Sequence, residues 1–144
     1  MKTVTKIIIS AVGTFVVVLV LGIASVIWLS SDEEYNKNYE AARIEGHDFG
    51  STTDNNGCMK EGLSRAPGTR LTEISKVTVK AAFVDECLKA SRPVSDFCKG
   101  VPWIISINNM EWRENQCELA GLDPDRTACL AVFDKKIDYC NLKK

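Results

Sequence analysis

The sequence predicts a small all-α domain, stapled by disulfides and made of about four helices, behind a single N-terminal transmembrane helix and a helical stalk. Three observations predict this class: an uncharged apolar run, apolar positions spaced by three and four, and six cysteines that all follow the run. The predicted organisation is a cytoplasmic N-terminus at 1–6, a transmembrane helix at 7–29, a stalk and linker at 30–57, and a disulfide-bonded domain at 58–144.

Residues 7–29 contain no charged side chain. As a helix they would extend about 34 Å at ~1.5 Å per residue, enough to cross the ~30 Å hydrocarbon core of a bilayer. A cleaved signal peptide is the alternative, and the small residues at 22–24 and 29–31 resemble cleavage sites. Because cleaved apolar regions usually span about 7–15 residues, the length favours a retained anchor.

The charges on either side of this run predict its orientation. Lys2 and Lys6 precede it, whereas three consecutive acids at 32–34 follow it. The positive-inside rule therefore places the N-terminus in the cytoplasm and the C-terminal domain outside. Six cysteines in that domain agree, since disulfides persist in oxidising compartments. No asparagine lies in an Asn-x-Ser/Thr sequon, which favours the inner membrane and periplasm of a bacterium.

The segment after the anchor predicts a weakly buried stalk. Residues 32–45 begin with acids, as a helix start does, and Gly46 is expected to end the helix. Residues 46–57 are rich in Gly, Asp, Asn, Ser and Thr and predict a turn-rich linker. The folded domain is then expected to begin at Cys58, with a short helix up to Arg65.

Two longer helices are predicted in the middle of the domain. Apolar residues in 69–91 recur at helical spacing, at Leu71, Ile74, Val77, Ala81, Val84 and Leu88. A helix over 102–120 would place Trp103, Ile107, Met110 and Cys117 on one seam, with Gly121 as its end. Alternatively, 101–107 forms a short strand, and Asn108 or Asn109 caps a later helix.

The last helix has the clearest start signals. Asp123 is the predicted N-cap and Pro124 the first helical residue. One face then carries the apolar residues Cys129, Leu130, Phe133, Ile137 and Cys140.

The six cysteines allow fifteen complete pairings. A helical hairpin that turns at Pro93 would pair Cys87 with Cys98, and one that turns at 121–124 would pair Cys117 with Cys129. Cys58 and Cys140 would then form the third bridge. Zinc sites and thioredoxin-like redox sites need a C-x-x-C spacing, whereas no two cysteines here are closer than eleven positions. Disulfides are therefore predicted, and no metal site.

The polar loop 47–54 holds the only residues that suggest a hydrolase: His47, Asp48, Asp54 and the hydroxyls of 51–53. A solvated surface loop is the favoured interpretation, because a triad needs members fixed by a rigid scaffold. Three acids, Glu111, Glu114 and Glu118, share helical spacing and are interpreted as a solvated face. No catalytic residue and no cofactor-binding motif is assigned.

Trp103 and Trp112 are the candidate interface residues, because exposed tryptophans are enriched in protein interfaces. Trp112 lies off the predicted seam, and burial in a broader core stripe is the favoured alternative for it. No basic stripe suggests nucleic-acid binding. The expected function is non-enzymatic: binding or scaffolding another envelope or membrane protein from a single-pass anchor. The alternatives are a small hydrolase that uses 47–54, and an accessory subunit of a membrane complex, which an exposed apolar patch would favour.

Overall fold

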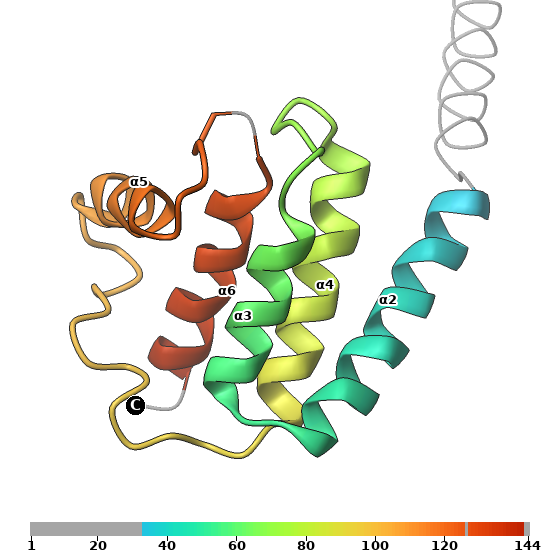
Figure 1. Cartoon of the computed structure of the whole chain (residues 1–144), viewed down its shortest axis with the longest axis horizontal. Coiled ribbons are helices and arrows are strands. Elements are labelled where there is room, and N and C mark those ends of the chain that lie inside the picture. Colours follow the sequence, from blue (N-terminus) through green and yellow to red (C-terminus); the bar gives the residue numbers. More distant parts are fainter. Residues whose placement is uncertain (1–32, 126, 143–144) are drawn as a thin grey trace, which may run out of the picture. The chain divides into compact units, whose positions relative to one another are not determined.

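A computed structural model describes residues 33–125 and 127–142, and the predicted membrane span lies outside them. The described residues form five helices and no strand, joined by three disulfides. The helices are α2 (Glu33–Thr52), α3 (Asn55–Arg65), α4 (Ile74–Ala90), α5 (Asn109–Leu119) and α6 (Cys129–Leu142) (Figure 1). In the described part of the chain, no helix has the length and apolar content needed to cross a bilayer.

Helix α2 does not end at Gly46 as predicted but continues to Thr52. Gly46 and Gly50 are buried against α4, where an added Cβ would lie 2.3 Å and 2.4 Å from the carbonyl oxygens of Phe83 and Cys87. The glycines thus permit close packing of two helices rather than a stop. The compact unit accordingly begins at Lys37, so the predicted linker is part of the bundle.

Helix α4 is the centre of the core and packs against α3 and α6. Phe83, Val84 and Leu88 of α4 and Val132 of α6 are fully buried. Each contributes about 1.5–3 kcal/mol of burial free energy. The predicted helical spacing over 69–91 is confirmed in α4, although its first apolar residue, Ile74, is exposed.

Arg65 joins three helices. Its guanidinium lies 3.8 Å from the ring centroid of Phe83 and is bonded to Glu45 at 2.7 Å and Glu61 at 2.8 Å. The hydrogen bond from Arg65 lowers the pKa of Glu45 below its ordinary value of 4.5. The last turn of α3 is also held by Lys80, which donates to the Arg65 carbonyl.

After α4 the chain does not return as a helix. Residues 91–108 form turns and extended stretches, and Arg92 pairs with the α2–α3 junction through hydrogen bonds of 3.1 Å to Thr53 and Asn55. Buried Asn55 donates to Ser91 at 2.7 Å and to the Tyr139 hydroxyl at 3.3 Å. The C-terminal ends of α4 and α6 therefore lie together.

The start of α5 follows the later of the two predicted alternatives. Asn108 occupies the N-cap position, but its side chain makes no capping bond, and 101–107 forms no strand. The predicted seam is wrong for Trp103 and Ile107, because they precede the helix and are exposed. Only Cys117 of that seam is buried.

Helix α6 begins at Cys129, whereas the sequence predicted a start at Pro124 with Asp123 as the N-cap. Asp123 caps a turn instead, accepting from the backbone of Asp125 at 2.9 Å, and the Thr127 hydroxyl accepts from the N–H of Cys129 at 3.3 Å. The predicted apolar face of α6 is confirmed as buried.

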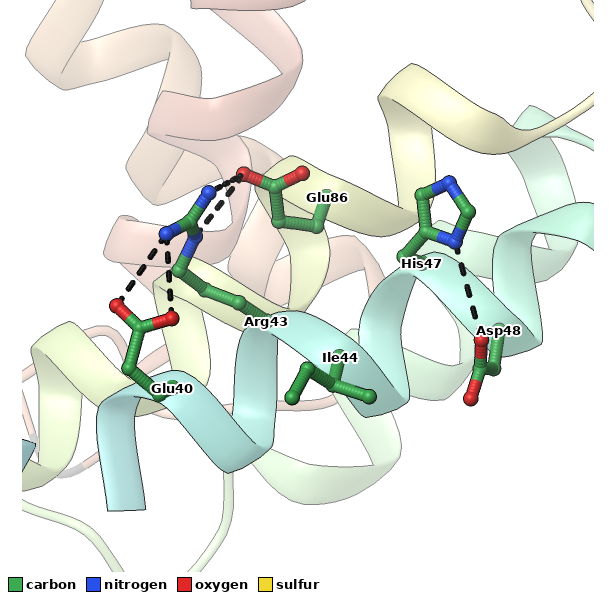
Figure 2. Close-up of a pocket in the computed structure, with 6 residues that line it drawn as sticks. All are labelled: Glu40, Arg43, Ile44, His47, Asp48 and Glu86. Carbon is green, nitrogen blue, oxygen red and sulfur yellow. Dashed lines mark hydrogen bonds and ion pairs between the residues drawn. The ribbon is translucent and has the colours of Figure 1, made fainter. Parts of the chain in front are cut away.

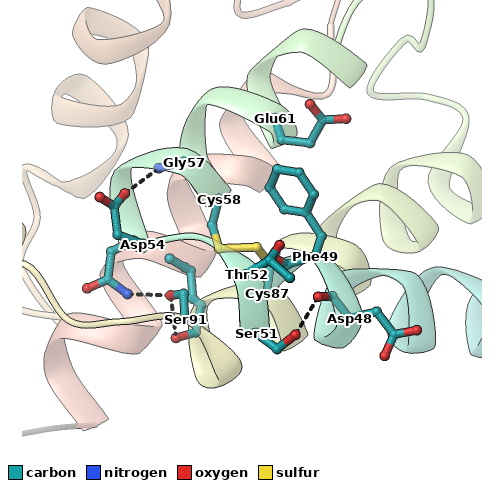
Figure 3. The surroundings of a disulfide bond; sticks show 12 residues. Asp48, Phe49, Ser51, Thr52, Asp54, Gly57, Cys58, Glu61, Cys87 and Ser91 are labelled. Carbon is teal, nitrogen blue, oxygen red and sulfur yellow. Dashed lines mark hydrogen bonds between the residues drawn. A yellow bond between two sulfur atoms is a disulfide. The ribbon is translucent and has the colours of Figure 1, made fainter.

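The disulfides correct two predicted pairings. Cys117–Cys129 forms as predicted, whereas the other two bridges are Cys58–Cys87 and Cys98–Cys140. The predicted helical hairpin around Pro93 does not form, because the residues directly after Pro93 are turns and not a helix. Cys87, in the last turn of α4, instead faces Cys58 on α3, and the loop carries Cys98 to the end of α6 (Figure 3 shows the first bridge).

Candidate functional site

The predicted polar loop 47–54 is mostly helix. Ser51 and Thr52 donate their hydroxyls to the carbonyls of Asp48 and Phe49, at 2.7 Å and 2.9 Å, within α2 (Figure 3). Asp54 is the N-cap of α3 and accepts from the N–H of Gly57 at 2.9 Å. The hydroxyls of Ser51 and Thr52 are thus engaged within the local backbone, and no hydrogen bond among the described residues joins a hydroxyl of 51–53 to His47.

His47 borders a shallow depression of about 260 Å³ on the outer side of α2 and α4 (Figure 2). Its Nδ1 lies 3.8 Å from the Asp48 carboxylate. Arg43 bonds to Glu86 at 3.2 Å and to Glu40 at 3.3 Å, and these hydrogen bonds raise its pKa above the ordinary value. The depression thus holds three carboxylates against one guanidinium, and no serine, threonine or cysteine is among the residues that line it.

Metal ligation has no candidate in the described ranges, where no three His, Cys, Asp or Glu side chains are grouped to hold an ion. All six cysteines are disulfide-bonded, so none is available as a thiolate ligand.

The main surface feature is instead an apolar segment, residues 103–110. Nine large hydrophobic side chains are exposed in the described residues, and five of them belong to this segment: Trp103, Ile104, Ile105, Ile107 and Met110. Ile105 is 82% exposed and Ile107 97%. The chain carries no charge from Val101 to Met110. Large apolar side chains gathered on the surface in this way are typical of an interaction site.

The apolar segment is held in place by side chains of specific residues. Asn141 of α6 donates to the Pro102 carbonyl at 3.1 Å and accepts from the N–H of Ile104 at 3.3 Å. Asn109 donates to the Ile104 carbonyl at 2.6 Å. The Cys98–Cys140 disulfide fixes the loop a few residues earlier. These bonds reduce the conformational freedom of an exposed hydrophobic loop.

The hydrogen bonds that hold the apolar segment leave one buried polar atom of the described residues unpaired. The Oδ1 atom of Asn109 is buried and has no hydrogen-bond partner in the described residues. Buried polar atoms are almost always paired, and an unpaired one costs about 1–3 kcal/mol.

The two predicted interface tryptophans differ in their surroundings. Trp103 is half-exposed and belongs to the apolar segment. Trp112 is partly buried and packs edge-to-face on Phe133, with ring centroids 5.8 Å apart. Ile104 and Ile105 were not singled out from the sequence, although the uncharged stretch from Val101 to Met110 was a signal for them.

Comparison with known proteins gives no relative from which a function could be transferred: no protein-family model, no curated protein and no solved structure matches this chain.

Proposed function

We propose that this chain is a membrane-anchored binding protein of a bacterial envelope, whose disulfide-bonded domain holds another envelope protein outside the cytoplasm. The observation that carries the proposal is the exposed and braced apolar segment, residues 103–110. Catalysis would need a nucleophile beside a base, whereas binding needs apolar area that a partner covers.

The location of the domain is proposed on two independent grounds. Residues 7–29 have the length and composition of a membrane span, with cations before it and acids after it. Three disulfides, which leave no free thiol, suit an oxidising compartment. A reporter that is active only outside the cytoplasm, fused after Lys144, should be active. Activity of a cytoplasm-only reporter at the same position would contradict this orientation.

Co-purification tests the binding proposal. The tagged full-length chain is recovered from detergent-solubilised membranes and compared with Ile105→Ser/Ile107→Ser, which makes the most exposed part of the apolar segment polar. Ile44→Ser is the matched control, because Ile44 is also exposed, at 62%, but lies on α2. We expect the double variant to lose a co-purifying protein that the wild type and the control retain. Equal recovery in all three would contradict the proposal.

The hydrolase alternative has a separate test. His47→Ala should leave the cellular role intact. In the described part of the chain, the ion-pair contact of the His47 side chain is with its neighbour Asp48, which offers no nucleophile for it to activate. Loss of the role at normal abundance would instead favour an enzyme built on α2.

A further inference from the structure

The outward face of α5 continues the apolar segment with negative charge. Residues spaced by three and four share one face of a helix, and Glu111, Glu114 and Glu118 have this spacing. Met110, the last residue of the apolar segment, lies one turn before Glu114. A partner that covers the segment therefore meets these three carboxylates next.

The opposite face of α5 is occupied by α6. Trp112 packs on Phe133, Arg113 forms an ion pair with Asp134, and Cys117 is bonded to Cys129. Arg113, the one cation of α5, is therefore directed inward. The side chains of the three glutamates form no hydrogen bond or ion pair with any described residue. We name these three residues the acidic row.

On this basis, and resting on the proposed binding function, we infer that the partner is a different protein that offers an apolar pocket bordered by lysines or arginines. The pocket receives the side chains of Ile105 and Ile107, which project almost fully into solvent. The basic border faces the acidic row. Stable interfaces cover about 800 Å² on each partner, so a partner seated on the apolar segment also covers neighbouring surface, and the acidic row is the next surface along α5.

The charge of the acidic row disfavours the other occupants. An anionic bilayer surface attracts basic segments by about 1 kcal/mol per charge and repels carboxylates in the same way. A second copy docked about a two-fold axis that passes near α5 would place two acidic rows against each other. The depression beside Ile44 is no substitute pocket, because three of its six lining residues are the acids Glu40, Asp48 and Glu86.

Photocrosslinking in the cells that make the protein tests this inference. A photoreactive phenylalanine analogue replaces Ile107 in the full-length chain, with Ile44 as the control position. We expect position 107, and not position 44, to give a product with another protein, and the linked peptide to be apolar with nearby Lys or Arg. A product that contains only a second copy of this chain would overturn the inference.

Charge then separates this inference from the proposed function. The partner that crosslinking identifies is purified, and its affinity for the full-length chain is measured. The triple variant Glu111→Gln/Glu114→Gln/Glu118→Gln should bind it roughly tenfold more weakly at low ionic strength. At about 1 M salt, where the Debye length is ~3 Å, the difference should vanish. If Ile107→Ser abolishes binding while the Gln variant binds normally at every salt concentration, the proposed function stands and the basic border is wrong. If neither variant weakens binding, both fail.

Vesicles provide the bilayer arm of the test. The full-length chain is reconstituted with Trp28→Phe and Trp112→Phe, which leaves Trp103 as the only tryptophan. Brominated phosphatidylcholine, with or without phosphatidylglycerol, should not quench its fluorescence, whereas acrylamide should. Strong quenching by the brominated lipid would assign the apolar segment to the bilayer and overturn the inference.

Discussion

The side chain of Asn141, near the C-terminal end of α6, accepts a hydrogen bond from the backbone N–H of Ile104 at 3.3 Å. The same side chain donates to the carbonyls of Pro102 and Ile137, at 3.1 Å and 2.8 Å. One amide thus connects the exposed apolar segment to the last turn of a core helix. Asn141 is therefore one of the residues that position the segment, together with Asn109 and the Cys98–Cys140 disulfide.

Replacing Asn141 with alanine should release the apolar segment without unfolding the core. Each net hydrogen bond contributes about 0.5–1.5 kcal/mol, so the free energy of unfolding should fall by roughly 1–3 kcal/mol. Amide hydrogen exchange should accelerate in 102–107 and stay slow in α4. Glu111→Ala, on the exposed face of the neighbouring helix, is the control and should leave exchange in 102–107 unchanged. Unchanged exchange in the Asn141 variant would contradict this role.

The disulfides should have separable effects. Peptide mapping without reductant should link Cys58 with Cys87, Cys98 with Cys140, and Cys117 with Cys129. Removing either of the first two bridges by serine substitution should cost about 2–5 kcal/mol. Only Cys98→Ser/Cys140→Ser should accelerate exchange in residues 99–108, because that bridge joins the loop to α6. A peptide linking Cys87 to Cys98 would contradict the fold of the loop.

Gly46→Leu should destabilise the contact between α2 and α4. Even the first carbon of the new side chain would fall 2.3 Å from the Phe83 carbonyl oxygen, so the helices must separate. Overpacking of this kind costs about 1–3 kcal/mol, measured by urea unfolding. Ala41→Leu on the exposed side of the same helix is the matched control. It should change stability by less than about 0.5 kcal/mol.

The bond between Arg65 and Glu45 should make stability depend on pH. Because folding lowers the pKa of Glu45, the folded state binds its proton less readily than the unfolded state does. The contribution is therefore complete above pH 4.5 and is lost as the pH falls through the lower pKa of the folded state. Glu45→Gln should reduce the difference in unfolding free energy between pH 7 and acid. An identical pH profile in the variant would exclude this contribution. The effect should be small, since Glu45 is more than half exposed.

The sequence alone determined the all-α class, the disulfide bonding of the cysteines, and the positions of the strongly periodic helices. The apolar spacing over 69–91 and the buried face that ends at Cys140 are local patterns, and the 3.6-residue period of a helix is sufficient to interpret them. The uncharged stretch from Val101 to Met110 was equally visible, although periodicity assigned Trp103 and Ile107 to a buried seam.

Only the tertiary structure decided which helices pack together and which cysteines pair. Gly46 has the local character of a helix stop, yet it allows α2 to pack on α4, because the backbone of Phe83 occupies the space that a side chain would need. The disulfide partner of Cys87 depended on the path that the chain takes after α4. The backbone of Arg92 fixes the start of that path through hydrogen bonds to Thr53 and Asn55. Contacts between residues distant in sequence have no local signature. Pairing and exposure were therefore settled only when the whole domain had packed.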